Sequence, residues 1–147
     1  NEKDQVLPEV LTEGFLKANP EKLNKSFTGG QRKYPDLYVE LSHQCRFAVE
    51  YERTRKPMVT YRTMLVSYSI FREVDLVLFI VEAESIKAAI QNAAIRIQYP
   101  FAKRPLAYAL AKDVRENSTS FQIELGQIQL PFKEFIQRIN KPLKATA

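Results

Sequence analysis

Two neighbouring segments alternate between apolar and polar side chains with the period of two that is typical of a β-strand. Residues 36–41, "DLYVEL", place every second apolar side chain on one face. In residues 45–53, "CRFAVEYER", the apolar side chains again share one face, while Glu50 and Glu52 share the opposite face. The pattern predicts two strands joined as a hairpin through "SHQC", with the two carboxylates roughly 7 Å apart along the second strand.

Other segments follow the helical spacing of apolar residues or form short apolar runs. The predicted helices are residues 5–18, 58–71 and 84–98 and a terminal helix that begins at Pro131. The predicted strands are residues 75–83, residues 106–112, and residues 119–130 interrupted by Gly126. Residues 19–33 are predicted as a helical turn followed by a loop at Gly29–Gly30. This order indicates a single α/β domain over residues 1–147, with a mixed central sheet flanked by helices.

Composition agrees with a globular domain, since 45% of the 147 residues are hydrophobic and 27% are charged. The longest apolar run, "LVLFIV", is too short to cross a bilayer, so we expect no membrane association. The chain lacks a signal-peptide pattern and an initiator methionine, and we expect a domain cut from a longer chain. One cysteine, Cys45, and one histidine exclude a Cys/His zinc site and favour a reducing, cytoplasmic location.

The net charge of +5 and the sequence pI near 9.3 are compatible with a polyanionic partner. The basic residues flank the alternating strands on both sides: Lys22, Lys25, Arg32, Lys33, Arg53, Arg55 and Lys56. We expect DNA contacts from Arg32, Lys33, Arg53, Arg55 and Lys56. A solvated charged rim explains the charge alone equally well.

Asp36, Glu50 and Glu52 are the candidate site. Carboxylates are rarely buried without a partner, and adjacent strands would carry these three acids close together. One partner is Mg²⁺ or Mn²⁺, which is bound through carboxylate oxygens and assists phosphodiester cleavage. The alternative for the two glutamates is a set of salt bridges to Arg46, Arg53 or Arg55.

Pro35-Asp36 followed by a hairpin and by Glu50-Tyr51-Glu52 resembles the metal-binding signature of the PD-(D/E)xK nuclease superfamily. The resemblance implies a restriction-endonuclease-like core, consisting of a helix, three strands, a helix and another strand. The first of these strands is not evident before Asp36 unless residues 23–27 supply it. Over residues 34–82 the chain is similar, more narrowly, to the replication-relaxation family of plasmid and mobile-element proteins.

The resemblance implies a DNA-processing protein that is a candidate Mg²⁺-dependent endonuclease, with Asp36, Glu50 and Glu52 as metal ligands. The three acids and Lys56 are then the catalytic residues. Most active members of the superfamily carry lysine at the position of Glu52, so this chain has ExE in place of (D/E)xK. Two alternatives stay open: a non-catalytic assembly module with a degenerate site and protein partners in a DNA-processing complex, and an α/β domain unrelated to nucleases.

Overall fold

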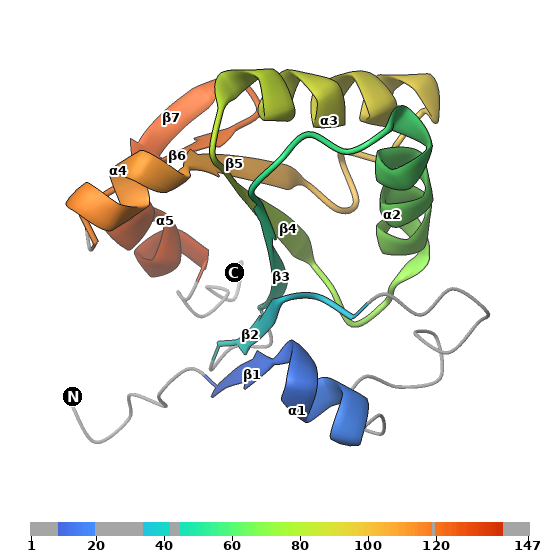
Figure 1. The fold of residues 1–147 in the computed structure, drawn as a ribbon. Coiled ribbons are helices and arrows are strands. Elements are labelled where there is room, and N and C mark those ends of the chain that lie inside the picture. The colour runs from blue at the N-terminus through green and yellow to red at the C-terminus, as the bar shows by residue number, and fades with distance from the viewer. Residues whose placement is uncertain (1–8, 20–33, 42–44, 119, 140–147) are drawn as a thin grey trace, which may run out of the picture.

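Seven strands lie side by side in chain order and form one mixed sheet (Figure 1). The computed structural model describes residues 9–19, 34–41, 45–118 and 120–139, and the elements named below belong to this part of the chain. The strands are β1 (Glu9–Thr12), β2 (Leu37–Glu40), β3 (Arg46–Glu52), β4 (Leu76–Val81), β5 (Leu106–Leu110), β6 (Gln122–Leu125) and β7 (Ile128–Pro131). The helices are α1 (Glu13–Ala18), α2 (Met58–Ile70), α3 (Glu84–Arg96), α4 (Ala111–Glu116) and α5 (Phe132–Ile139).

The sheet consists of an antiparallel part, a parallel part and a second antiparallel part. β1, β2 and β3 form an antiparallel meander, and β3, β4 and β5 are parallel. β6 and β7 continue the sheet as an antiparallel hairpin. Parallel neighbours need a crossover connection, and α2 and α3 provide the two crossovers. The predicted α/β fold with a mixed sheet and flanking helices is therefore confirmed.

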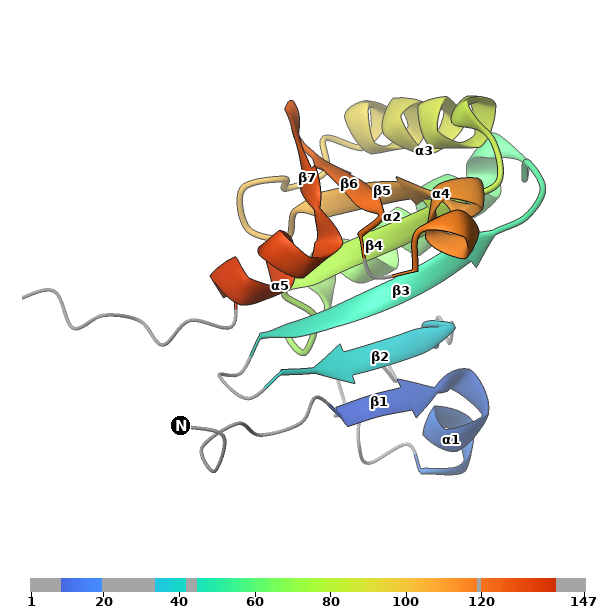
Figure 2. The same cartoon turned by 90° about the vertical axis from the view of Figure 1, so that its left-hand side faces the viewer.

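Each face of the sheet carries its own core. One core joins side chains of α1, α2 and α3 to β2, β3, β4 and β5, and includes Tyr38, Ala48 and Phe79. The other core joins α4 and α5 to the opposite face and includes Val39 and Phe47. The view in Figure 2, turned by 90°, shows α4 and α5 in front of the sheet and α2 behind it. β4 is buried on both faces, as its continuous apolar run predicts.

The predicted helix over residues 5–18 is wrong in its middle part, where β1 occupies residues 9–12. Val10 pairs with Val39, and Thr12 with Leu37, so the segment completes the meander as an edge strand. The Thr12 hydroxyl accepts a hydrogen bond from Phe15 N at 3.2 Å and caps α1, which ends the strand there. Apolar spacing did not separate the two elements, because pairing with β2 is a long-range interaction.

Three predictions in the second half also need correction. The predicted strand over residues 106–112 ends at Leu110, and Ala111 begins α4. The interruption at Gly126 is a hairpin turn, with φ +63° at Gly126 and Leu125 paired with Ile128. Pro131 ends β7, so the terminal helix begins one residue later.

Some predictions lie outside the described residues: the turn and loop of 19–33 from residue 20 onwards, the strand candidate 23–27, and the hairpin connection 42–44. Arg32 and Lys33 lie there as well. Among the helices of the described part, none has the length and apolar character needed to cross a membrane.

Candidate functional site

Asp36 and Glu50 lie on neighbouring strands at the same level of the sheet. Leu37 pairs with Val49, so the same antiparallel register places Asp36 opposite Glu50 one step further on. Asp36 Oδ2 accepts a hydrogen bond from Tyr51 N at 2.8 Å, which holds the carboxylate against the backbone of β3. The β2–β3 register therefore places Asp36 and Glu50 at neighbouring backbone positions, and the convergence of their carboxyl groups stays a prediction.

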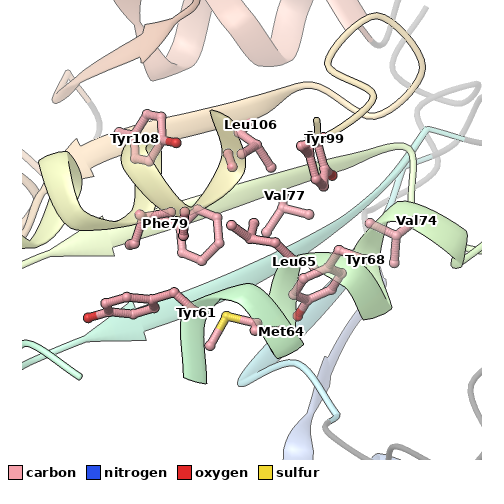
Figure 3. Packing of buried hydrophobic residues seen from close by; sticks show 14 of the residues in the cluster. Tyr61, Met64, Leu65, Tyr68, Val74, Val77, Phe79, Tyr99, Leu106 and Tyr108 are labelled. Carbon is pink, nitrogen blue, oxygen red and sulfur yellow. The ribbon is translucent and has the colours of Figure 1, made fainter. Parts of the chain in front are cut away.

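Glu50 is fully buried beneath α2. The hydroxyl of Tyr68, in the last turn of α2, donates a hydrogen bond to Glu50 Oε1. Figure 3 shows Tyr61 and Tyr68 among the packed side chains of this core. Burial, reinforced by the charge of Glu50 and by this hydrogen bond, raises the pKa of Tyr68 well above its ordinary value. The charge of Asp36 acts in the same direction, so Tyr68 keeps its proton and remains a hydrogen-bond donor to Glu50.

Glu52 is also fully buried, and its partner is Lys56. Lys56 Nζ lies 2.9 Å from Oε2 of Glu52 and 3.1 Å from Oε1. The Lys56 backbone amide donates to the Tyr61 hydroxyl at 3.0 Å, which fixes the residue at the start of α2. Lys56 therefore takes the place of the arginines that we considered as partners of Glu52. Arg46 instead pairs with Asp75, with Nε 3.2 Å from Oδ2.

The basic residues that follow β3 differ in their surroundings. Arg53 and Arg55 are exposed, and Lys56 is only partly exposed because it reaches back to Glu52. They leave the sheet where the parallel strands β3, β4 and β5 reach their C-terminal ends. We call this end of the strands the carboxyl edge of the sheet. Asp36 lies at this edge as well, because β2 runs opposite to β3. Open α/β sheets commonly bind ligands outside the carboxyl ends of their strands.

Two contributors to the site were not recognised in the sequence. Tyr61 and Tyr68 are core residues of α2, and their hydroxyl groups also contact the site. Their seven-residue spacing on one helix face was the available signal. In addition, Glu13 N donates to the Asp36 carbonyl oxygen at 3.1 Å, so the start of α1 adjoins the same acid.

Asp36 and Glu50 carry carboxylate oxygens, the ligand type that a hard divalent cation prefers. Magnesium is commonly held by one or two carboxylates and completes its octahedron with water and substrate phosphate. Within the described residues, no three His, Cys, Asp or Glu side chains group closely enough to hold a metal ion. This agrees with the engagement of Glu52 by Lys56, which leaves two carboxylates rather than three for a cation.

Comparison of the chain with protein-family profiles, curated proteins and solved structures found no match.

Proposed function

We propose that this chain is a DNA-binding domain of the PD-(D/E)xK type, in which Asp36 and Glu50 hold Mg²⁺ or Mn²⁺. The observation that carries the proposal is the fixed position of Asp36, whose carboxylate binds Tyr51 N beside the buried Glu50. Two acids held at one sheet edge, with cations next to them, suit a phosphodiester substrate.

The connectivity of the sheet supports this proposal. The meander β1–β2–β3, the crossover helix α2 and the parallel strand β4 occur in the same order as the strands and second helix of the PD-(D/E)xK core, with β1 in the position of the first strand. The chain departs from that core at α1, which lies between β1 and β2 instead of before the three strands. Fold alone does not establish activity, so the roles below are argued from the residues.

Asp36 and Glu50 are the proposed metal ligands, and a bound cation would polarise the scissile phosphate and lower the pKa of attacking water. Glu52 and Lys56 act together at the position where the superfamily usually has lysine. The ammonium group of Lys56 lies against the Glu52 carboxylate, so a positive charge is present there although the motif residue is acidic. Lys56 is 36% exposed, which gives it access to the solvent side of the pair.

DNA is the proposed partner because exposed cations adjoin the acids. Arg53 and Arg55 follow directly after β3 at the same end of the sheet as the acids, where exposed cations would attract a phosphate backbone. The similarity to the replication-relaxation family suggests a role in plasmid or mobile-element replication, or in related DNA processing.

A metal titration combined with a plasmid-nicking assay tests the proposal. Mn²⁺ should raise the melting temperature of the wild type, since a ligand that binds only the folded state stabilises it by about 2.7 kcal/mol at a hundred times its Kd. Asp36→Asn and Glu50→Gln should remove this rise. Asp75→Asn is the matched control, because Asp75 lies before β4 at the opposite edge of the sheet. A wild type with no metal-dependent rise and no nicking would contradict the metal site.

The second candidate is a non-catalytic DNA-binding or assembly module with the same fold. The observation that favours it is the salt bridge between Glu52 and Lys56, which occupies both residues that would handle the attacking water. This candidate predicts metal-dependent stabilisation and DNA binding without nicking. Nicking by the wild type that disappears in Glu50→Gln would exclude it.

A further inference from the structure

A second polar cluster lies at the carboxyl edge, on the face of the sheet opposite Glu50 and Glu52. Its centre is Glu82, the residue that follows β4. Arg115 of α4 donates two hydrogen bonds to Glu82, from Nη1 at 2.7 Å and from Nη2 at 3.0 Å. The Tyr51 hydroxyl donates to Oε1 of the same carboxylate. Alternation along β3 directs Tyr51 away from its neighbours Glu50 and Glu52, so the cluster and the acid site lie on opposite faces.

The charges of this cluster are fixed at neutral pH. Hydrogen bonds from Arg115 and then Tyr51 lower the pKa of Glu82 to about 2, and the nearby charge of Arg53 adds to the effect. Two guanidinium groups therefore accompany one carboxylate, and the cluster keeps a net positive charge. The Arg115 side chain is 60% exposed, so the positive charge is presented to solvent.

The hydrogen bonds to Glu82 leave part of the Arg115 guanidinium available. This group has five N–H donors, and Glu82 uses two of them. A guanidinium held in plane by one carboxylate is pre-organised to bind a second planar or tetrahedral anion with its remaining donors. Glu82, which itself accepts a hydrogen bond from Tyr51, thus fixes the orientation in which Arg115 would meet an anion.

We propose that Arg115, held in place by Glu82, and the exposed Arg53 at the end of β3 bind a backbone phosphate of the DNA on the α4 side of the carboxyl edge. The inference rests on the proposed function, since it places a second phosphate contact across the sheet edge from the acid site. Figure 2 shows α4 at the same end of the sheet as the ends of β3 and β4. A strand of DNA that crosses this edge at Asp36 and Glu50 would meet Arg53 first and Arg115 next.

The test measures the affinity of labelled duplex DNA by fluorescence anisotropy as a function of salt. Arg115→Ala should weaken binding several-fold at 0.15 M salt, and it should reduce the slope of log K against log salt by about 0.9, the change expected for one lost phosphate contact. Arg96→Ala is the matched control, because Arg96 is an exposed arginine at the end of α3, at the opposite edge of the sheet. Arg115→Lys retains the charge but not the paired donors, and should give an intermediate affinity.

Glu82→Gln tests the same phosphate contact, but here we expect the affinity for DNA to rise instead of fall. It removes a negative charge beside the proposed phosphate contact and keeps a side-chain oxygen that can accept a hydrogen bond from Arg115, so DNA binding should become tighter than in the wild type. Asp75→Asn is its control, since Asp75 is an arginine-paired acid at the other end of β4. This variant also keeps the inference testable if Arg115→Ala fails to fold.

The outcomes separate this inference from the proposed function. If Arg115→Ala binds DNA as tightly as Arg96→Ala, while a variant with Arg53, Arg55 and Lys56 all replaced by Ala loses affinity, only the Arg115 contact is overturned. Glu82→Gln that binds no tighter than Asp75→Asn overturns the same contact. A wild type without measurable, salt-dependent DNA binding overturns both the contact and the proposed function.

Discussion

Replacing Tyr68 by phenylalanine removes one hydroxyl group and leaves the packing of α2 on the sheet in place. Tyr68 is 2% exposed and its hydroxyl donates to Glu50, which is 0% exposed. A hydrogen bond to a charged group contributes about 1.5–3 kcal/mol, and a buried acceptor that loses its donor pays a desolvation cost in the same range. We therefore expect Tyr68→Phe to lower the free energy of unfolding by about 2 kcal/mol at pH 7.

The chain offers a matched control for the loss of a buried hydroxyl. Tyr99 is 4% exposed, and its hydroxyl has no hydrogen-bond partner among the described residues. Tyr99→Phe removes the same atom without breaking a bond to the protein, so its unfolding free energy should stay within about 0.5 kcal/mol of the wild type. The difference in unfolding free energy between Tyr68→Phe and Tyr99→Phe gives the contribution of the hydrogen bond, separate from the effect of making the ring less polar.

A double-mutant cycle with Glu50→Gln identifies the charge as the source of the effect. In the Glu50→Gln background the Tyr68 hydroxyl donates to a neutral amide, and its loss should cost only about 1 kcal/mol. The coupling free energy between the two positions should then be about 1 kcal/mol. Urea unfolding provides these values, and thermal unfolding should show a decrease of about 6 °C for Tyr68→Phe alone. Equal costs of Tyr68→Phe in both backgrounds would refute the role assigned to Glu50.

Two further predictions concern stability and use urea or thermal unfolding. Lys56→Met should lower the unfolding free energy by about 2 kcal/mol because it leaves Glu52 buried without its cation. Adding Glu52→Leu should restore most of this loss. A double variant that is as unstable as Lys56→Met would contradict this explanation. Gly126→Ala should cost about 1–2 kcal/mol at φ +63°. Gly14→Ala in α1 should stabilise by about 0.5–1 kcal/mol, since no atom lies within 4 Å of the added Cβ. Equal effects at the two glycines would argue against the left-handed conformation at Gly126.

The sequence predicted β2 and β3 well because their side chains alternate between two buried faces of the sheet. β2 and β3 alternate because each face meets a different core, with Val39 and Phe47 in one core and Tyr38 and Ala48 in the other. β1 was missed because a four-residue edge strand needs little burial, and Val10 remains 54% exposed. Its assignment depends on pairing with β2, across a stretch of more than twenty residues, which local spacing does not encode.

The acids of the candidate site could be identified from their motif, but the groups that hold them could not. Tyr68 meets Glu50 across 18 positions, and Arg115 meets Glu82 across 33. Lys56 was expected to contact phosphate, whereas its ion pair with Glu52 depends on the tight turn into α2. Such contacts arise from the crossover helix and from α4, so they follow from the assembled sheet and not from residue spacing.

The placement of Glu50 and Glu52 in β3 also bears on function. Buried ion pairs can usually be replaced by apolar residues of similar volume with little loss of stability, and sometimes with a gain. Stability therefore gives no reason for two carboxylates in a strand that lies between two apolar cores. Departures from the local rules of folding concentrate at functional sites, where a costly residue persists because its chemistry is used. The same strand carries Tyr51, whose hydroxyl donates to Glu82 in the second polar cluster on the other face of the sheet. β3 therefore contributes to both polar clusters at the carboxyl edge, where DNA is proposed to bind.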